Sequence, residues 1–160
     1  MTTNPSVLVV MGSKSDLPIG EKCLGVLKEL GVTYQLMVCS AHRTPEELSA
    51  LVKGSKAEVF IAIAGLSAAL PGAIAAYTLR PVIGVPVSGK LNLDCILAIV
   101  QMPPGIPVGA VGLDMGENAG ILAAQILAVK DPAIYEKLKA HRTRMKEKVM
   151  KDAEELSGKA

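Results

Sequence analysis

Five times along this chain, a short apolar run rich in β-branched residues is followed by a stretch of helical character. The apolar runs are residues 6–11, 32–40, 57–65, 80–87 and 106–113, and the helical stretches after them are 15–30, 45–53, 70–78, 91–101 and 117–129. This alternation predicts a five-stranded, mostly parallel sheet with helices on both faces. The runs are nearly continuous in apolar residues, which is typical of strands buried on both sides.

The length of 160 residues is sufficient for one domain with a substantial core and too short for two ordinary domains. We therefore expect a single α/β domain over residues 1–160, with its core over about 6–130. It is a three-layer, doubly wound fold of the flavodoxin-like or Rossmann-like kind, with an extra C-terminal helix over about 131–156.

The predicted C-terminal helix is highly charged and has a narrow apolar stripe. The stripe consists of Ile134, Leu138, Met145 and Val149. Acidic residues interrupt its basic residues, and no aromatic residues are interleaved between positions 137 and 151, so a solvated face is favoured over a nucleic-acid face. His141 is assigned to that solvated face and given no chemical role.

The composition favours self-association in the cytoplasm. Half of the residues are hydrophobic and only 20% are charged, so we expect copies of the chain to cover part of its surface as a homo-oligomer. A net charge of +2 is too small to indicate nucleic acid or a membrane surface as the main partner.

Three widely spaced cysteines predict reduced cytosolic thiols rather than disulfides or a zinc site. Glycine and proline divide the uncharged run 59–79 into strand, turn and helix rather than a membrane span.

In an open parallel sheet, ligands bind beyond the carboxyl ends of the strands, near the point where strand order reverses. After the first predicted strand, Gly12, Ser13, Ser15 and Asp16 open a helix. Glycine permits close backbone approach, hydroxyls donate hydrogen bonds and a helix N-terminus favours an anion, so a phosphate or phosphosugar fits. The same residues can equally form a helix cap in a tight turn that needs no ligand. The pattern is neither a Walker P-loop nor a complete G-x-G-x-x-G.

The second predicted strand is followed by Ser40, Ala41, His42 and Arg43. An imidazole exchanges protons near neutral pH, and an adjacent arginine can hold a phosphate or carboxylate. The alternative is a loop histidine bonded to nearby backbone. The segment from Thr44 to Glu47 matches a capping box, with Pro45 at the first helical position. A pair of Cys39 thiol and His42 base is a further, less favoured interpretation.

The third predicted loop and the last helix start supply further candidates. Small residues without titratable groups form the third loop, and they allow either close approach to a flat ligand in a dry pocket or simple helix packing. The candidates in this loop are Gly65, Ser67, Ala68, Leu70 and Gly72. Asn118, near the start of the last core helix, is either a cap or a ligand contact.

Six segments, in order and at natural spacings, resemble one known family. They read "MGSKSD", "SAHRTPE", "ALPG.IAA", "PVIGVPV", "VQMPPGIPVG" and "ENAGILAAQILA". Together they resemble the 5-(carboxyamino)imidazole ribonucleotide mutase family of de novo purine biosynthesis, also called phosphoribosylaminoimidazole carboxylase catalytic subunit, over roughly residues 6–150. The resemblance implies a three-layer α/β fold, an octamer, and no metal, biotin or ATP.

The resemblance also implies roles for single residues. His42 would move a proton between the exocyclic nitrogen and the neighbouring ring carbon of the substrate while carboxylate leaves one and joins the other. Ser13, Asp16 and Arg43 would hold the ribose phosphate. Ser40 and the 65–72 loop would surround the imidazole.

One segment departs from the family pattern. The mutases usually read Ala-Ala-His-Leu-Pro-Gly in the third loop, whereas this chain has Ser67, Ala68 and Ala69 before Leu-Pro-Gly. The missing histidine resembles a related class that carboxylates aminoimidazole ribonucleotide with carbon dioxide directly, but Arg43 after His42 follows the mutases. We expect the mutase, with the carboxylase as one alternative and a noncatalytic phosphosugar-binding paralogue as the other.

Overall fold

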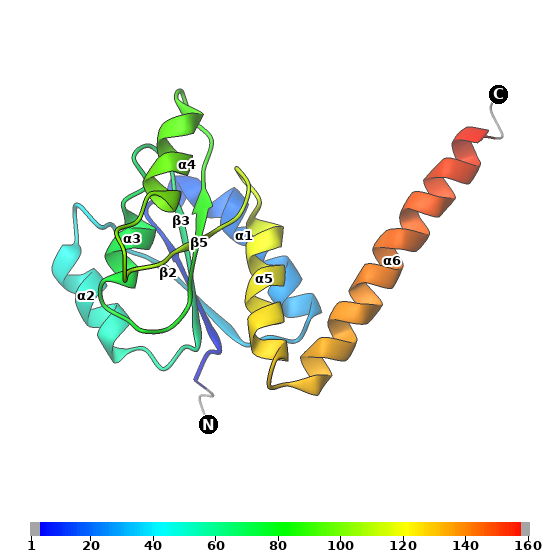
Figure 1. Ribbon diagram of the computed structural model, residues 1–160, viewed down its shortest axis with the longest axis horizontal. Coiled ribbons are helices and arrows are strands. Elements are labelled where there is room, and N and C mark those ends of the chain that lie inside the picture. Colours follow the sequence, from blue (N-terminus) through cyan, green and yellow to red (C-terminus); the bar gives the residue numbers. More distant parts are fainter. Residues whose placement is uncertain (1–3, 158–160) are drawn as a thin grey trace.

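The computed structural model describes residues 4–157, and its centre is a five-stranded parallel sheet (Figure 1). The strands are β1 Val7–Met11, β2 Tyr34–Val38, β3 Val59–Ala64, β4 Val82–Pro86 and β5 Gly109–Ala110. Their order is β2-β1-β3-β4-β5, so the direction of winding reverses between β1 and β3. This order is that of the flavodoxin-like, doubly wound fold and confirms the predicted fold class.

Helices form the two outer layers (Figure 1). They are α1 Leu17–Glu29, α2 Pro45–Gly54, α3 Leu70–Ala75, α4 Asn92–Val100, α5 Gly116–Ala128 and α6 Pro132–Ser157, with a short 3₁₀ turn, η1, over Lys14–Asp16 before α1. Helices α1 and α5 cover one face of the sheet, and α2, α3 and α4 cover the other. Each helix lies within a few residues of its predicted position.

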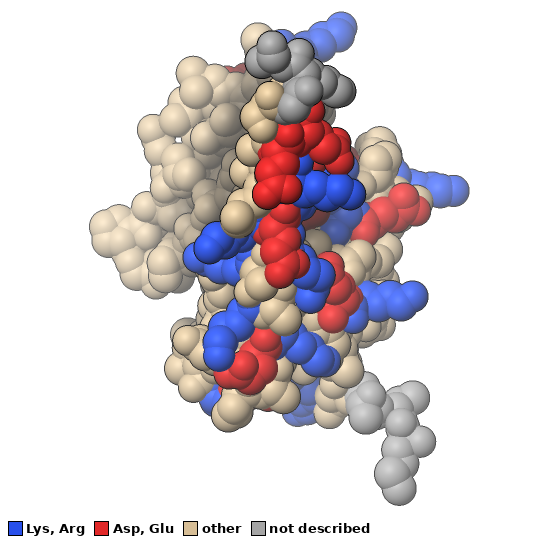
Figure 2. Space-filling view, turned by 90° about the vertical axis from the view of Figure 1, so that its right-hand side faces the viewer, with Lys and Arg blue, Asp and Glu red and all other residues tan. Residues whose placement is uncertain are grey.

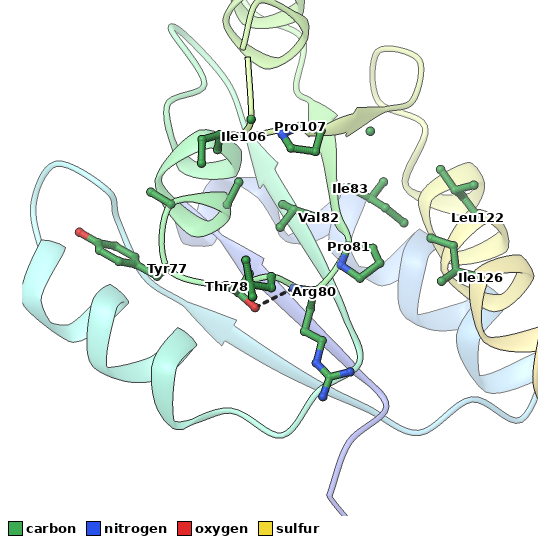
Figure 3. Close-up of a pocket in the computed structure, with 15 residues that line it drawn as sticks. Tyr77, Thr78, Arg80, Pro81, Val82, Ile83, Ile106, Pro107, Leu122 and Ile126 are labelled. Carbon is green, nitrogen blue, oxygen red and sulfur yellow. Dashed lines mark hydrogen bonds between the residues drawn. The ribbon is translucent and has the colours of Figure 1, made fainter. Parts of the chain in front are cut away.

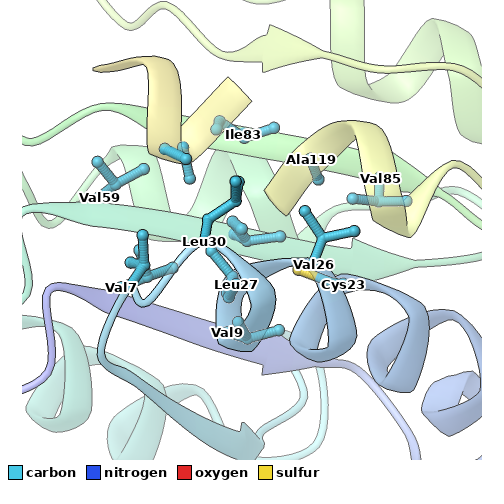
Figure 4. Packing of buried hydrophobic residues seen from close by; sticks show 14 of the residues in the cluster. Val7, Val9, Cys23, Val26, Leu27, Leu30, Val59, Ile83, Val85 and Ala119 are labelled. Carbon is cyan, nitrogen blue, oxygen red and sulfur yellow. The ribbon is translucent and has the colours of Figure 1, made fainter. Parts of the chain in front are cut away.

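Side chains of the central strands alternate between the two faces. Val7 and Val9 of β1 pack beneath α1 and α5 (Figure 4), whereas Leu8 and Val10 face α2, α3 and α4. This period of two gives each layer its own apolar core. Where α5 crosses α1, a Cβ on Gly116 would lie 2.2 Å from the carbonyl oxygen of Ile19, so only glycine fits this contact.

The two edge strands differ from the prediction. β2 is only half buried, because one of its edges and part of its surface are open to solvent. β5 has two residues instead of the eight expected, and they pair only with Ile83 and Gly84 of β4. Prolines before β5, including Pro107, have no N–H to donate to a strand ladder, which explains why pairing is so brief. The strand and helix expected within 59–79 are present as β3 and α3. Between residues 4 and 157, no helix is both long and apolar enough to cross a membrane.

The final helix, α6, packs on the body only at its start and then projects away from it (Figure 1). Ile134 and Leu138 contact the core beneath α1 and α5, whereas Met145 and Val149 are exposed. Acidic and basic side chains are interspersed along α6 (Figure 2). The prediction for His141 is wrong: its side chain is only 16% exposed, and Nδ1 lies 2.9 Å from Oε1 of Glu29 at the end of α1.

Candidate active site

The loop after β1 is held by a reciprocal cap between Ser13 and Asp16. The backbone N–H of Ser15 donates to Ser13 Oγ at 3.3 Å, and the N–H of Ser13 donates to Asp16 Oδ2 at 3.1 Å. The Ser15 hydroxyl also donates to Asp16 Oδ1 at 3.4 Å. The cap foreseen from the sequence is therefore present, and the same residues line a cavity.

Asp16 is the charged residue buried most deeply in this loop, with 7% of its surface exposed. Burial raises its pKa above the usual 3.8, because a carboxylate loses hydration in this position. Hydrogen bonds from Ser13 and Ser15, and the positive charge of Arg43, act in the opposite direction and favour the ionised form. Its neighbours therefore orient the carboxyl group, which lies buried within the loop.

The loop after β2 is fastened to the loop after β1 by Arg43. Its Nη2 donates to the carbonyl oxygen of Gly12 at 2.9 Å, and its Nε donates to Ser40 Oγ at 3.2 Å. His42, the residue before it, has an exposed side chain that borders the cavity. The bidentate arrangement of the guanidinium holds the His42 segment beside Ser13 and Asp16.

Helix α2 starts at Pro45 as predicted, but the capping box does not form. The Thr44 side chain makes no cap to the helix. Instead, Thr44 Oγ1 accepts from the N–H of Ser40 at 2.9 Å and donates to the Ser40 carbonyl at 3.1 Å, so it closes the loop on itself. Cys39 is buried with its Sγ 3.3 Å from Thr44 Oγ1, an environment that does not support a Cys39–His42 thiol and base pair.

The loop after β3 has an unusual backbone. Leu66 and Ala68 have φ angles of 51° and 24°, in a region that L-residues with a side chain rarely adopt. Gly65 lies tightly against the next strand end, since a Cβ there would be 3.3 Å from the carbonyl oxygen of Val87. The N–H of Ala68 donates to the Gly65 carbonyl at 3.0 Å and closes a tight turn.

These three loops enclose a cavity of about 570 Å³ at the carboxyl ends of β1, β2 and β3. It straddles the point where strand order reverses, which is where ligands bind in this fold. Its lining residues are Gly12, Ser13, Ser15, Asp16, Ser40, Ala41, His42, Arg43, Ala64, Gly65, Leu66, Ser67, Ala68, Ala69 and Leu70. Eleven of the thirteen candidates from the sequence are among them.

Gly72 and Asn118 do not line this cavity. Gly72 packs in the first turns of α3, where a Cβ would lie 3.2 Å from Met102 Sδ. Asn118 borders a different cavity, between α5 and α6, together with His141. Leu66 lies in the 65–72 loop that was expected to surround the imidazole, but it was not named as a single candidate, because no sequence signal marks a leucine that adopts a positive φ.

A larger cavity, of about 870 Å³, lies at the opposite end of β4 (Figure 3). Apolar side chains such as Val82, Ile106 and Ile126 border it, and Tyr77 and Arg80 are its titratable residues. It lies away from the carboxyl ends of the strands and holds no group that exchanges protons near neutral pH. The smaller cavity, which His42 borders, is therefore the better candidate for the active site.

Among residues 4–157, no cluster of three or more histidine, cysteine, aspartate or glutamate side chains could hold a metal ion. The three cysteines are unpaired and buried. Burial raises the pKa of the Cys23 thiol to about 12, so it stays protonated and packs as an apolar group under α5. The ionisable side chains in the cavity are Asp16, His42 and Arg43.

Residues 6–148 match the family model described as AIR carboxylase. The chain belongs to the AIR carboxylase family. A member from Methanocaldococcus jannaschii, named N5-carboxyaminoimidazole ribonucleotide mutase, is 56% identical over 151 residues, which cover 94% of this chain and 96% of that protein. A Thermotoga maritima protein of the same name is 46% identical over 157 residues, covering 95% and 92%.

Solved structures of this family have the same architecture. The crystal structure of Treponema denticola PurE superposes with a TM-score of 0.86 at 30% identity and covers 94% of this chain and 97% of its own. A second crystal structure, of a substituted form of Treponema denticola PurE2, gives a TM-score of 0.88 at 29% identity, covering 96% and 99%. The family assignment therefore rests on both sequence and fold, as the resemblance in the six segments predicts.

Proposed function

We propose that this protein is an N5-carboxyaminoimidazole ribonucleotide mutase of de novo purine biosynthesis. The observation that carries the proposal is that His42, a residue type suited to proton exchange near neutral pH, borders a cavity it shares with Asp16 and Arg43. The names of the relatives from Methanocaldococcus jannaschii and Thermotoga maritima support the same activity.

The reaction moves a carboxyl group from nitrogen to carbon, and His42 serves both halves. When the carbamate N–C bond breaks, the nitrogen keeps the electron pair and takes a proton from the imidazolium, and carbon dioxide is released. The electron-rich ring carbon then attacks carbon dioxide, forms the new C–C bond and returns its proton to the imidazole. One imidazole suffices if it lies close to both atoms, since proximity makes each transfer intramolecular.

The polar residues of the cavity are suited to the ribose phosphate. Ser13 and Ser15 supply hydroxyls at the start of a helix, where the backbone favours an anion. Arg43 adds positive charge, and because Gly12 and Ser40 fix two of its donors, its orientation is set before ligand arrives. Asp16 offers acceptors for hydroxyl groups.

The lining also includes a group of apolar residues, which is suited to the imidazole ring and to carbon dioxide. Its small or aliphatic side chains are those of Ala41, Ala64, Ala68, Ala69 and Leu70. An apolar lining offers no water or nucleophile to capture released carbon dioxide. Ala69 stands where the mutases usually have histidine, and it is compatible with this role because His42 remains as the proton carrier.

The proposal is tested by an assay that identifies which carboxyl donor the protein uses. Purified protein should convert the carbamate to 4-carboxy-5-aminoimidazole ribonucleotide without added bicarbonate, and labelled carbon dioxide in solution should enter product only slowly. Ala69 is the feature that favours a carboxylase instead. Rapid turnover of aminoimidazole ribonucleotide with dissolved carbon dioxide, and no direct use of the carbamate, would establish that alternative. Ligand binding without turnover of either donor would identify a noncatalytic paralogue.

We further propose that the enzyme works as a cytoplasmic homo-oligomer, an octamer by family resemblance. Leu93, Leu97 and Val100 form an exposed apolar stripe on α4, and Met145 and Val149 are exposed on α6. Sedimentation should give an assembly much larger than the 16.7 kDa monomer. Truncation after Lys130 should loosen that assembly before it abolishes the domain fold, because α6 contributes little to the core.

A further inference from the structure

Leu66 adopts a backbone conformation that its side chain disfavours. It follows Gly65 in the tight turn after β3, and its φ of 51° lies in the left-handed region. Glycine is the residue that fits this region without steric conflict between Cβ and the backbone. The chain places its glycine one residue earlier, at Gly65, where φ is not positive and a Cβ would lie in tight contact, 3.3 Å from the carbonyl oxygen of Val87.

The side chain of Leu66 gains nothing from burial in return. It is 84% exposed, although it belongs to the lining of the cavity that also holds His42 and Ser67. An exposed leucine with a strained backbone is unfavourable on both counts. Strain of this kind persists where the surroundings enforce it, and it concentrates at ligand clamps and active sites.

We propose that Leu66 covers the mouth of the cavity when the ribonucleotide is bound and retains carbon dioxide between its release from nitrogen and its capture by carbon. The side chain would exchange contact with water for contact with the flat imidazole and the apolar wall formed by Ala68 and Ala69. This inference rests on the proposed mutase function. It assigns Leu66 no proton transfer; its role is to cover the intermediate.

The experiment follows the fate of the carboxyl carbon in the full-length protein. The carbamate is supplied with ¹³C in its carboxyl group, in buffer equilibrated with unlabelled carbon dioxide, and the label retained in the product is measured by mass spectrometry. Leu66→Ala removes the covering side chain and keeps a Cβ in the strained position. Leu66→Gly removes the side chain and the strain together. Leu66→Met keeps an apolar cover.

Wild-type protein should retain nearly all of the label. Leu66→Ala and Leu66→Gly should each lose at least roughly three times as much label as wild type, because an uncovered cavity lets carbon dioxide escape before capture. Leu66→Met should behave like wild type. Leu79→Ala is the matched control, since Leu79 is also exposed but borders the cavity at the opposite end of the sheet. It should retain the label.

The thermal midpoint separates the backbone effect from the covering effect. Leu66→Gly should melt higher than Leu66→Ala, because glycine relieves the left-handed strain, although both should release label. Equal retention in wild type, Leu66→Ala and Leu66→Gly would overturn this inference and leave the mutase function intact. A wild-type protein that does not convert the carbamate would overturn the mutase function and this inference with it.

Discussion

Arg43 and Gly12 are joined by a 2.9 Å hydrogen bond from a guanidinium nitrogen to a main-chain carbonyl, and this bond ties the loop after β2 to the loop after β1. Through it, the segment that carries His42 is fixed beside the Ser13–Asp16 cap. The site is therefore assembled by contacts between loops that are 31 residues apart in sequence.

Replacing Arg43 should weaken binding of the ribonucleotide much more than binding of the nucleoside that lacks phosphate. Loss of a charge-assisted contact costs about 1.5–3 kcal/mol, so Arg43→Ala should raise the dissociation constant of the ribonucleotide about 10- to 100-fold. Arg43→Lys should recover little, because lysine lacks the planar fork that reaches Gly12 and Ser40 together. Calorimetric titration with both ligands measures the difference, and an equal loss for both would refute the phosphate assignment.

Thr44 should matter to stability through its hydroxyl group and not through a helix cap. Thr44→Val keeps the shape but leaves the N–H of Ser40 without its acceptor, whereas the Ser40 carbonyl still accepts from the backbone N–H of residue 44; the variant should lower the free energy of unfolding by about 1–3 kcal/mol. Thr44→Ser should restore most of it. Glu47→Ala is the control: the capping box is absent, so its effect should stay within about 0.5 kcal/mol. Denaturant unfolding measures all three, and a larger loss for Glu47→Ala would contradict the geometry.

The contrast at Thr44 illustrates what the sequence can predict. Local patterns located the starts of the helices and the alternation of strands correctly, because they depend on nearest neighbours and on burial. The same local pattern suggested a capping box, but the Thr44 hydroxyl bonds to the backbone of Ser40, four residues earlier. Side-chain to backbone hydrogen bonds of this local kind compete with a helix cap, and the residue types alone do not show which of the two forms.

The candidate site shows the same division. Residues that directly follow a strand, such as Ser13 and His42, were predictable because parallel strands all end at one edge of the sheet. Leu66 was not singled out within the 65–72 loop, since the residue types do not show that its φ angle is positive. His141 was misassigned because helical periodicity does not reveal that Glu29, over a hundred residues away, approaches it.

The charge of Asp16 should lower the free energy of unfolding at neutral pH. The same carboxyl group should contribute to binding of the ribonucleotide. Burial raises its pKa in the folded state, so the stability linked to its protonated form is present below pH 3.8 and is lost as pH rises through the raised value. Asp16→Asn removes the charge and should leave stability at pH 7 unchanged or increased by up to about 1 kcal/mol. The variant should bind the ribonucleotide about tenfold more weakly, through lost contacts to hydroxyls.

Unfolding measured between about pH 3 and pH 7 should therefore show the wild type losing stability relative to Asp16→Asn as pH rises. The opposite trend, with the wild type gaining relative to the variant, would show that the hydrogen bonds from Ser13 and Ser15 outweigh burial.

The contact between Glu29 of α1 and His141 of α6 should stabilise the fold at neutral pH and lose this contribution in acid, which is the opposite of the trend for Asp16. The hydrogen bond from His141, followed by that from Arg144, lowers the pKa of Glu29 below its usual 4.5. Stability from this pair is therefore present above pH 4.5 and is lost as pH falls through the lowered value. Because Glu29 is partly exposed, Glu29→Gln should cost only about 0.2–1 kcal/mol, and the cost should shrink in high salt.

Thermal unfolding of Glu29→Gln at about pH 7 and about pH 3 measures this contribution. The difference from wild type should be larger at the higher pH than at the lower one. Glu47→Gln, at an exposed glutamate on α2, provides the comparison and should differ little from wild type at either pH. A difference for Glu29→Gln that is undiminished in acid would mean that packing, not charge, joins α6 to α1.

The role of His42 as the proton carrier is tested by the rate at which purified His42→Asn converts the carbamate, measured beside its affinity for the ribonucleotide. An amide can donate or accept a hydrogen bond to the ligand at this position but cannot carry a proton. If His42 moves the proton between nitrogen and carbon, kcat should fall on the order of 10²-fold or more while the dissociation constant changes little. Near-normal turnover by His42→Asn would contradict the assignment of His42 as the acid and base of this reaction.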